Sequence, residues 1–148
     1  MKKLVLCTLS ILPTLQRGLL LLLVSNSQSI LVVDDEFDIV ESIKLWLHKR
    51  GLEVQGFTNP LLALEYFKNN SSRIGLVLSD IRMPQMNGFE LVKRMRTMGT
   101  EVRIILMSAF EINHGEMTRV LPDIKIDSLI SKPISLRNLT KTINKISK

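Results

Sequence analysis

The chain has 148 residues, 45% hydrophobic and 23% charged, which is long enough for one sizeable core and is not the composition of a disordered protein. Lys2, Lys3 and Arg17 supply half of the net charge of +6, so residues 28–148 carry only a modest positive excess that does not indicate nucleic-acid binding. The single cysteine, Cys7, excludes an internal disulfide, and with only two histidines it argues against a zinc site.

Residues 1–27 form an apolar leader that differs in composition from the rest of the chain. Its apolar segment, 4–24, is long enough to span a membrane, although Pro13 and Arg17 interrupt it. On insertion scales a central Arg costs about 2.5–3.5 kcal/mol and each Leu returns about 0.3–0.6 kcal/mol, so the leucines offset Arg17. The segment is therefore a candidate membrane anchor, and the boundary with the following domain is predicted near residue 28.

From Ile30 onward, short apolar runs alternate with longer amphipathic segments. Strands are predicted at 30–33, 53–57, 74–79, 102–107 and 128–131. Helices are predicted at 36–50, 60–69 and 88–98, within 111–120, and after Pro133. Asn59 is a plausible N-cap before Pro60, and Gly51 and Gly99 lie just past the ends of the first and third helices.

Five strand–helix units in succession predict an α/β fold. The buried strands favour a doubly wound, five-stranded parallel sheet with helices on both faces, of the flavodoxin-like type. In such a sheet, ligands bind beyond the carboxyl ends of the strands, near the point where the strand order reverses.

Polar residues follow four of the predicted strands at that edge. They are Asp34-Asp35-Glu36, Asp80, Ser108-Ala109 and Lys132-Pro133. Clustered carboxylates repel one another, and a hard divalent cation such as Mg²⁺ relieves this because it prefers oxygen ligands. An acidic cluster beside a lysine therefore predicts a magnesium site that handles a phosphoryl group, with a carboxylate as the nucleophile.

Four segments together resemble the receiver domain of two-component response regulators. They are ILVVDDE (30–36), LVLSDIRMPQMNGFEL (76–91), IILMSAF (104–110) and LISKPIS (129–135). The acid pair alone is a weak signal, whereas D-x-x-M-P-x-M-x-G from Asp80 to Gly88 is specific. The resemblance covers roughly residues 28–148.

The resemblance implies a role for each matching position. Asp80 matches the phosphoacceptor and also contacts the metal. Asp35 matches the direct Mg²⁺ ligand, Asp34 its water-mediated partner, and the backbone carbonyl of Arg82 the third protein ligand.

Two further positions match the groups that contact the phosphoryl group, Ser108 as the hydroxyl and Lys132 as the pairing ammonium. The Lys132–Pro133 bond is expected to be cis, as in the family. The chain departs from many receivers at Leu129, where they carry Tyr or Phe as a switch. Arg82 and Phe110 occupy positions that tune the phosphate lifetime in this family.

The resemblance implies a phosphorelay protein that is not an enzyme. A histidine kinase or phosphotransfer protein would supply the phosphoryl group, and a separate effector would bind the switched surface. We expect a stand-alone, cytoplasmic receiver without direct DNA binding.

The main alternative is a phosphate-independent binding module, although none of the acids nor the lysine is missing. A haloacid-dehalogenase-type phosphatase would need D-x-D, and a dinucleotide-binding domain would need G-x-G-x-x-G; both are absent.

The leader conflicts with this compartment. With Lys2 and Lys3 before the segment and no basic residue between Val24 and Lys44, the positive-inside rule would place the receiver outside the cytoplasm, away from ATP-derived phosphoryl groups. Three interpretations stay open: a membrane tether through residues 4–24, an extra packed helix, or a start site later than Met1. We favour the third, which the intact mass of the native protein would test.

Overall fold

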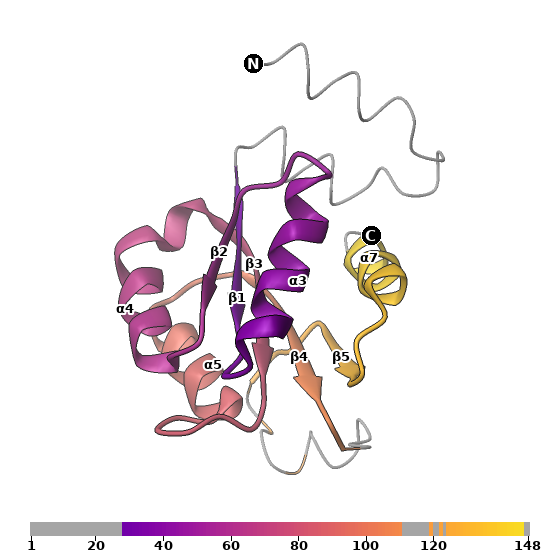
Figure 1. The fold of residues 1–148 in the computed structure, drawn as a ribbon. Helices are drawn as coiled ribbons and strands as arrows, with labels where there is room; N and C mark the ends of the chain where they lie inside the picture. The colour runs from indigo at the N-terminus through magenta and orange to yellow at the C-terminus, as the bar shows by residue number, and fades with distance from the viewer. Residues whose placement is uncertain (1–27, 111–118, 120–121, 123, 147–148) are drawn as a thin grey trace.

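The structure, a computed structural model, describes residues 28–110, 119, 122 and 124–146. Five parallel strands form one sheet in the order β2-β1-β3-β4-β5 (Figure 1). The strands are β1 (Ser29–Val33), β2 (Val54–Phe57), β3 (Ile74–Asp80), β4 (Arg103–Ser108) and β5 (Ser128–Ser131). The described helices are α3 (Phe37–His48), α4 (Pro60–Asn70), the 3₁₀ helix η2 (Ser71–Arg73), α5 (Gly88–Thr97) and α7 (Leu136–Lys145). The predicted fold class is confirmed.

Both faces of the sheet are covered, because alternate residues of each central strand point into different cores. In β1, Ile30 and Val32 pack in one core with α3 and α7, whereas Leu31 and Val33 pack in the other with α4 and α5. Figure 1 shows these helix pairs on opposite sides of the sheet. All of these β1 side chains are fully buried, which explains why the strand is a continuous apolar run.

The predicted boundaries agree with the structure to within about two residues. Asn59 caps α4, since its side chain accepts a hydrogen bond from Leu61 N at 2.9 Å. Gly51 and Gly99 follow α3 and α5 with φ of 79° and 72°, conformations that glycine adopts readily. The predicted cis bond before Pro133 is present.

Two predictions lie outside the described residues: the leader of residues 1–27 and the helix within 111–120. Within the described part of the chain, no helix has both the length and the apolar character needed to cross a membrane.

Gly88 is the first residue of α5 and lies against the start of the loop that follows β3. Its backbone N–H donates to the Ile81 carbonyl at 2.8 Å. A Cβ at this position would overlap the Asp80 carbonyl oxygen and lie 3.0 Å from Ile81 Cα. The glycine of the D-x-x-M-P-x-M-x-G motif therefore allows α5 to start in contact with the end of β3.

We predict that Gly88→Ala lowers the free energy of unfolding by about 1–3 kcal/mol, because the added methyl meets backbone atoms that cannot move freely. Urea denaturation measures this loss. Gly99→Asn is the matched control, since nothing lies within 4 Å of its Cβ and Asn tolerates positive φ. Equal losses for the two variants would contradict the proposed clash.

Candidate functional site

The strand register brings four chain segments to one edge of the sheet. Val33 of β1 pairs with Ser79 of β3, so the residues that follow β1 lie beside the end of β3. Asp80 pairs with Met107 of β4, and Ser108 pairs with Ser131 of β5. The next residues along β1 and β5 are Asp34 and Lys132. Side chains that are up to 98 residues apart in sequence therefore meet where the strand order reverses.

Lys132 is the centre of this group. Its ammonium Nζ lies 2.8 Å from Asp34 Oδ2, 3.0 Å from Asp80 Oδ1 and 3.2 Å from Glu36 Oε1. Its backbone N–H also donates to the Ser108 carbonyl at 2.7 Å, which ties the β5–α7 turn to the end of β4. Only 10% of the Lys132 side chain is exposed, so these charges interact with little screening by solvent.

Asp34 is fully buried, and its two carboxylate oxygens have different surroundings. Oδ1 accepts the backbone N–H of Glu36 at 3.0 Å. Oδ2 faces the Lys132 ammonium but accepts no well-aligned hydrogen bond. A buried carboxylate oxygen in this state leaves room for a further positive group.

Burial shifts the ionisation of both partners. Burial raises the pKa of Asp34, and this outweighs the opposing effects of the Lys132 ammonium and the Glu36 N–H. Burial alone would lower the pKa of Lys132, but the carboxylates of Asp34 and Asp80, within 3.0 Å of its ammonium, outweigh burial and raise that pKa. Lys132 is therefore a permanent cation at neutral pH.

The three predicted carboxylate ligands lie together. One oxygen from each of Asp34, Asp35 and Asp80 falls within 4.8 Å of the others, and Asp35 is the exposed member. These are three hard oxygen donors, and one of them belongs to the buried, incompletely satisfied carboxylate of Asp34. Such a group fits a divalent cation of the Mg²⁺ type. The carbonyl of Arg82 as a further ligand stays a prediction.

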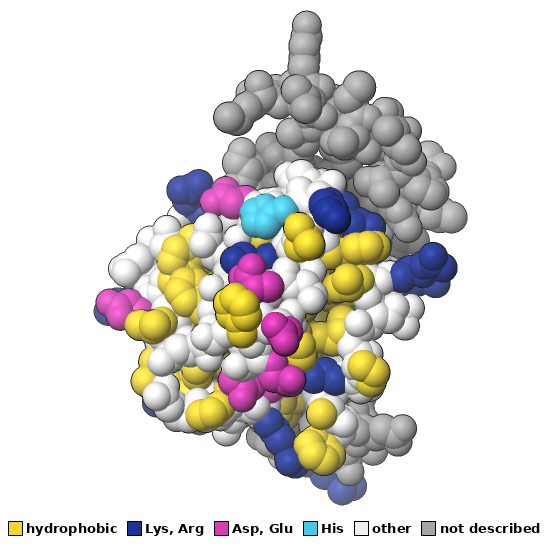
Figure 2. Space-filling view, in the orientation of Figure 1, with side chains coloured by type: hydrophobic (Ala, Val, Ile, Leu, Met, Phe, Trp, Pro, Cys, Tyr) yellow, Lys and Arg dark blue, Asp and Glu magenta, His cyan; other side chains and the backbone are white. Residues whose placement is uncertain are grey.

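Asp35, Asp80 and Lys132 line a hollow of about 290 Å³. It is lined by Asp35, Glu36, Asp80, Arg82, Ser108, Ala109, Phe110 and Lys132. Ser108 is buried, and its Oγ accepts the Phe110 N–H at 3.1 Å, which leaves its own hydroxyl hydrogen free to donate. Figure 2 shows acidic side chains gathered near the lower end of α3, where Asp35 and Glu36 are exposed.

Two contacts of this hollow were not predicted from the sequence. The sequence marks Glu36 as a strand-end acid without indicating a partner, and in the structure its Oε1 accepts a hydrogen bond from the Lys132 ammonium. The Arg82 guanidinium stacks 3.8 Å above the centre of the Phe110 ring, a cation–π contact at the rim. Neither contact has a local sequence signal, because each joins residues on different loops.

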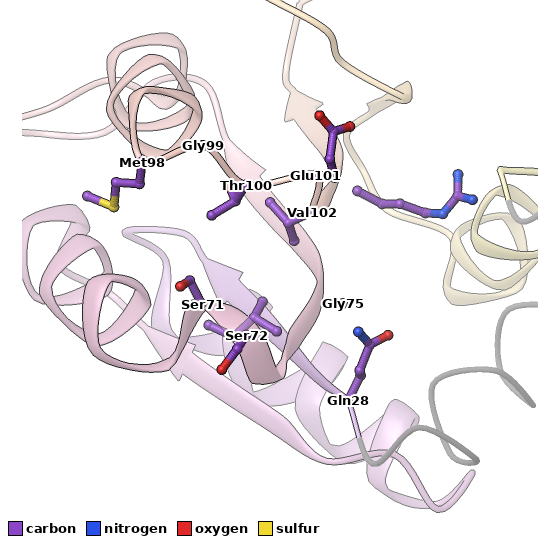
Figure 3. A pocket seen from close by; sticks show the side chains of 11 residues that line it. Gln28, Ser71, Ser72, Gly75, Met98, Gly99, Thr100, Glu101 and Val102 are labelled. Carbon is purple, nitrogen blue, oxygen red and sulfur yellow. The ribbon is translucent and has the colours of Figure 1, made fainter.

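A larger hollow of about 570 Å³ lies at the opposite edge of the sheet (Figure 3). Serine, threonine and glycine residues of the α4–β3 and α5–β4 connections line much of it, and only Glu101 and Arg103 of its lining residues are charged. This larger hollow holds no convergent charged groups. The smaller hollow beside Lys132 is therefore the stronger candidate for the functional site.

Comparisons with known proteins identify relatives of this chain. A family model described as the response regulator receiver domain matches residues 30–144. The response regulator SaeR of Staphylococcus epidermidis is 31% identical over 117 residues, which are 79% of this chain and 49% of that protein. SaeR of Staphylococcus aureus is 29% identical over the same lengths. The chain thus spans about half the length of these curated relatives.

Solved structures give the same result. The chemotaxis protein CheY4 of Vibrio cholerae is 26% identical, with a TM-score of 0.72 over 80% of this chain and 98% of that one. A CheY-like receiver domain protein from Methanospirillum hungatei is 27% identical, with a TM-score of 0.70 over 81% of this chain and 93% of that one.

We predict that Mg²⁺ stabilises the folded protein at neutral pH, by about 2.7 kcal/mol at 100 times its Kd. The gain shrinks as the pH falls, because protons compete for the carboxylates. The raised pKa of Asp34 also reduces this gain at low pH. The folded state binds the Asp34 proton more tightly than the unfolded state does, so the metal-free protein gains stability as the pH falls through that pKa.

Thermal unfolding with and without Mg²⁺ at a series of pH values measures this effect. Asp35→Asn should abolish the gain, whereas Asp38→Asn, which removes an exposed acid outside the three-carboxylate group, should keep it. A gain that is independent of pH, or unaffected by Asp35→Asn, would show that the cation binds elsewhere.

Proposed function

This chain belongs to the response regulator receiver domain family, and we propose that it accepts a phosphoryl group on Asp80 in a Mg²⁺-dependent reaction. One observation carries the proposal: the carboxylate of Asp80, only 4% exposed, lies against the Lys132 ammonium and beside the carboxylates of Asp34 and Asp35. A nucleophile, an anion-binding cation and the exposed metal-binding carboxylate of Asp35 thus line one hollow, and the buried Asp34 carboxylate lies beside them.

The proposed reaction transfers a phosphoryl group from a donor molecule to the carboxylate of Asp80. An oxygen of Asp80 forms a bond to phosphorus as the bond from phosphorus to the donor's nitrogen or oxygen breaks, and the donor keeps that electron pair. Asp34, Asp35, Asp80 and the Arg82 carbonyl would hold the Mg²⁺, which neutralises charge on the phosphoryl oxygens when it is bound.

Two side chains contact the transferred group directly in this proposal. The Lys132 ammonium donates to one phosphoryl oxygen, and its raised pKa keeps it protonated throughout. The Ser108 hydroxyl donates to another. Both are held in place before the reaction, by the ion pairs around Lys132 and by the burial of Ser108 at the end of β4, so little reorganisation is needed.

The chain modifies itself once and turns over no substrate, so we class it as a signalling domain and not as an enzyme. The donor is a histidine kinase or a phosphotransfer protein, as the family membership implies, and an effector reads the phosphorylated surface. Because such donors draw on ATP, we place the domain in the cytoplasm, or at its membrane surface if residues 4–24 anchor it.

We predict that the wild-type protein gains the mass of one phosphoryl group when it is incubated with acetyl phosphate and Mg²⁺. Intact-mass spectrometry detects the product, which hydroxylamine should remove because it is an acyl phosphate. Asp80→Asn should take up none, since it lacks the carboxylate nucleophile, and omission of Mg²⁺ should have nearly the same effect.

Asp38→Asn is the control, because it removes a nearby charge without touching the site residues. A wild-type protein that takes up no phosphate from acetyl phosphate or from a phosphorylated donor domain would contradict the proposal. The binding-module interpretation would then apply, with the acidic cluster serving only protein contacts.

A further inference from the structure

Glu36 occupies an unusual position for a glutamate. It is the N-cap of α3, yet its side chain forms no capping hydrogen bond with that helix. Its Oε1 instead accepts a hydrogen bond at 3.2 Å from Lys132, which lies 96 residues away. The carboxylate is therefore directed across the hollow and away from the N–H groups of its own helix.

The backbone of Glu36 is fixed by the same residue that pairs with Lys132. Asp34 Oδ1 accepts the Glu36 N–H, and Asp34 Oδ2 faces the Lys132 ammonium at 2.8 Å. The Glu36–Lys132 contact closes this into a ring of three residues. The position of the Glu36 carboxylate is thus set by buried groups, although its own side chain is 63% exposed.

A lysine ammonium has three N–H donors, and three carboxylates surround that of Lys132. To donate to a phosphoryl oxygen, it must release one of them. Asp34 is fully buried, so water cannot take the place of the lysine there, and its release is costly. Asp80 is the reacting group itself. Glu36 is exposed, so water replaces the lysine at little cost.

We propose that Glu36 is a positioning residue that holds the Lys132 ammonium in the resting state and gives it up to the phosphoryl group. This inference rests on the proposed function of Lys132 and Asp80. Because the Glu36–Lys132 bond exists only before transfer, it stabilises the unphosphorylated state and slows phosphoryl uptake. Exposed ion pairs change an equilibrium by a factor of about 1.4 to 5, which sets the size of the effect.

The first test compares Glu36→Ala with Asp38→Ala at saturating Mg²⁺. Both variants remove one exposed negative charge near the start of α3, but only Glu36 contacts Lys132. We expect Glu36→Ala to take up phosphate from acetyl phosphate about two- to fivefold faster than Asp38→Ala. High salt should shrink the difference, since exposed pairs are screened. Equal rates at low salt would overturn the proposal.

The second test needs no phosphorylation. A double-mutant cycle with Glu36→Ala and Lys132→Met, measured by urea unfolding without Mg²⁺, should give a coupling factor of about 1.4 to 5. The same cycle with Asp38→Ala should give a factor near one, and equal coupling in the two cycles would overturn the proposal. If the wild-type protein takes up no phosphate, the proposed function fails, while this cycle still decides whether Glu36 holds Lys132.

Discussion

The contact of the Lys132 ammonium with three carboxylates is the interaction on which the site depends. Asp34 and Asp80 are almost fully buried, and both would be unstable as anions without a cation beside them. Lys132 supplies one positive charge against the four acids Asp34, Asp35, Glu36 and Asp80, so the resting site keeps a negative excess. That excess favours binding of a divalent cation, while burial is the main reason why the pKa of Asp34 is raised.

The two cores determine where these charges lie. β1 and β3 are buried on both faces, so the body of each strand is uncharged and its acid lies at the carboxyl end. Asp34 directly follows β1, and Asp80 is the last residue of β3. Parallel pairing in fixed register then holds the two acids side by side. Gly88 packs α5 against the Asp80 carbonyl, which limits how far the end of β3 can move. The rigidity of the site is therefore a consequence of packing.

The sequence contained enough information for the fold and for most of the site. Apolar strand runs, the Asn59 cap and the glycines after α3 and α5 are local signals, and the structure agrees with them. The association of Lys132 with Asp34 and Asp80 followed from parallel topology, because strand ends share one edge. The Glu36–Lys132 bond and the Arg82–Phe110 stack could not be predicted, since they depend on side-chain directions on separate loops. Leu129 shows the same limit: it is partly buried against the α4–α5 core, which its sequence position alone does not reveal.

Differences in burial decide which part of the site can respond to a phosphoryl group. Lys132 connects the start of α3 with the end of β3 and the β5–α7 turn, and its backbone is held by Ser108. α3 and α7 are also joined directly, because the Trp46 indole N–H donates to Thr140 Oγ1 at 3.1 Å. Buried Asp34 cannot change partner without a large loss, whereas exposed Glu36 can. A rearrangement of Lys132 therefore begins on the Glu36 side of the hollow, at the first residue before α3, while the buried sheet edge keeps its geometry.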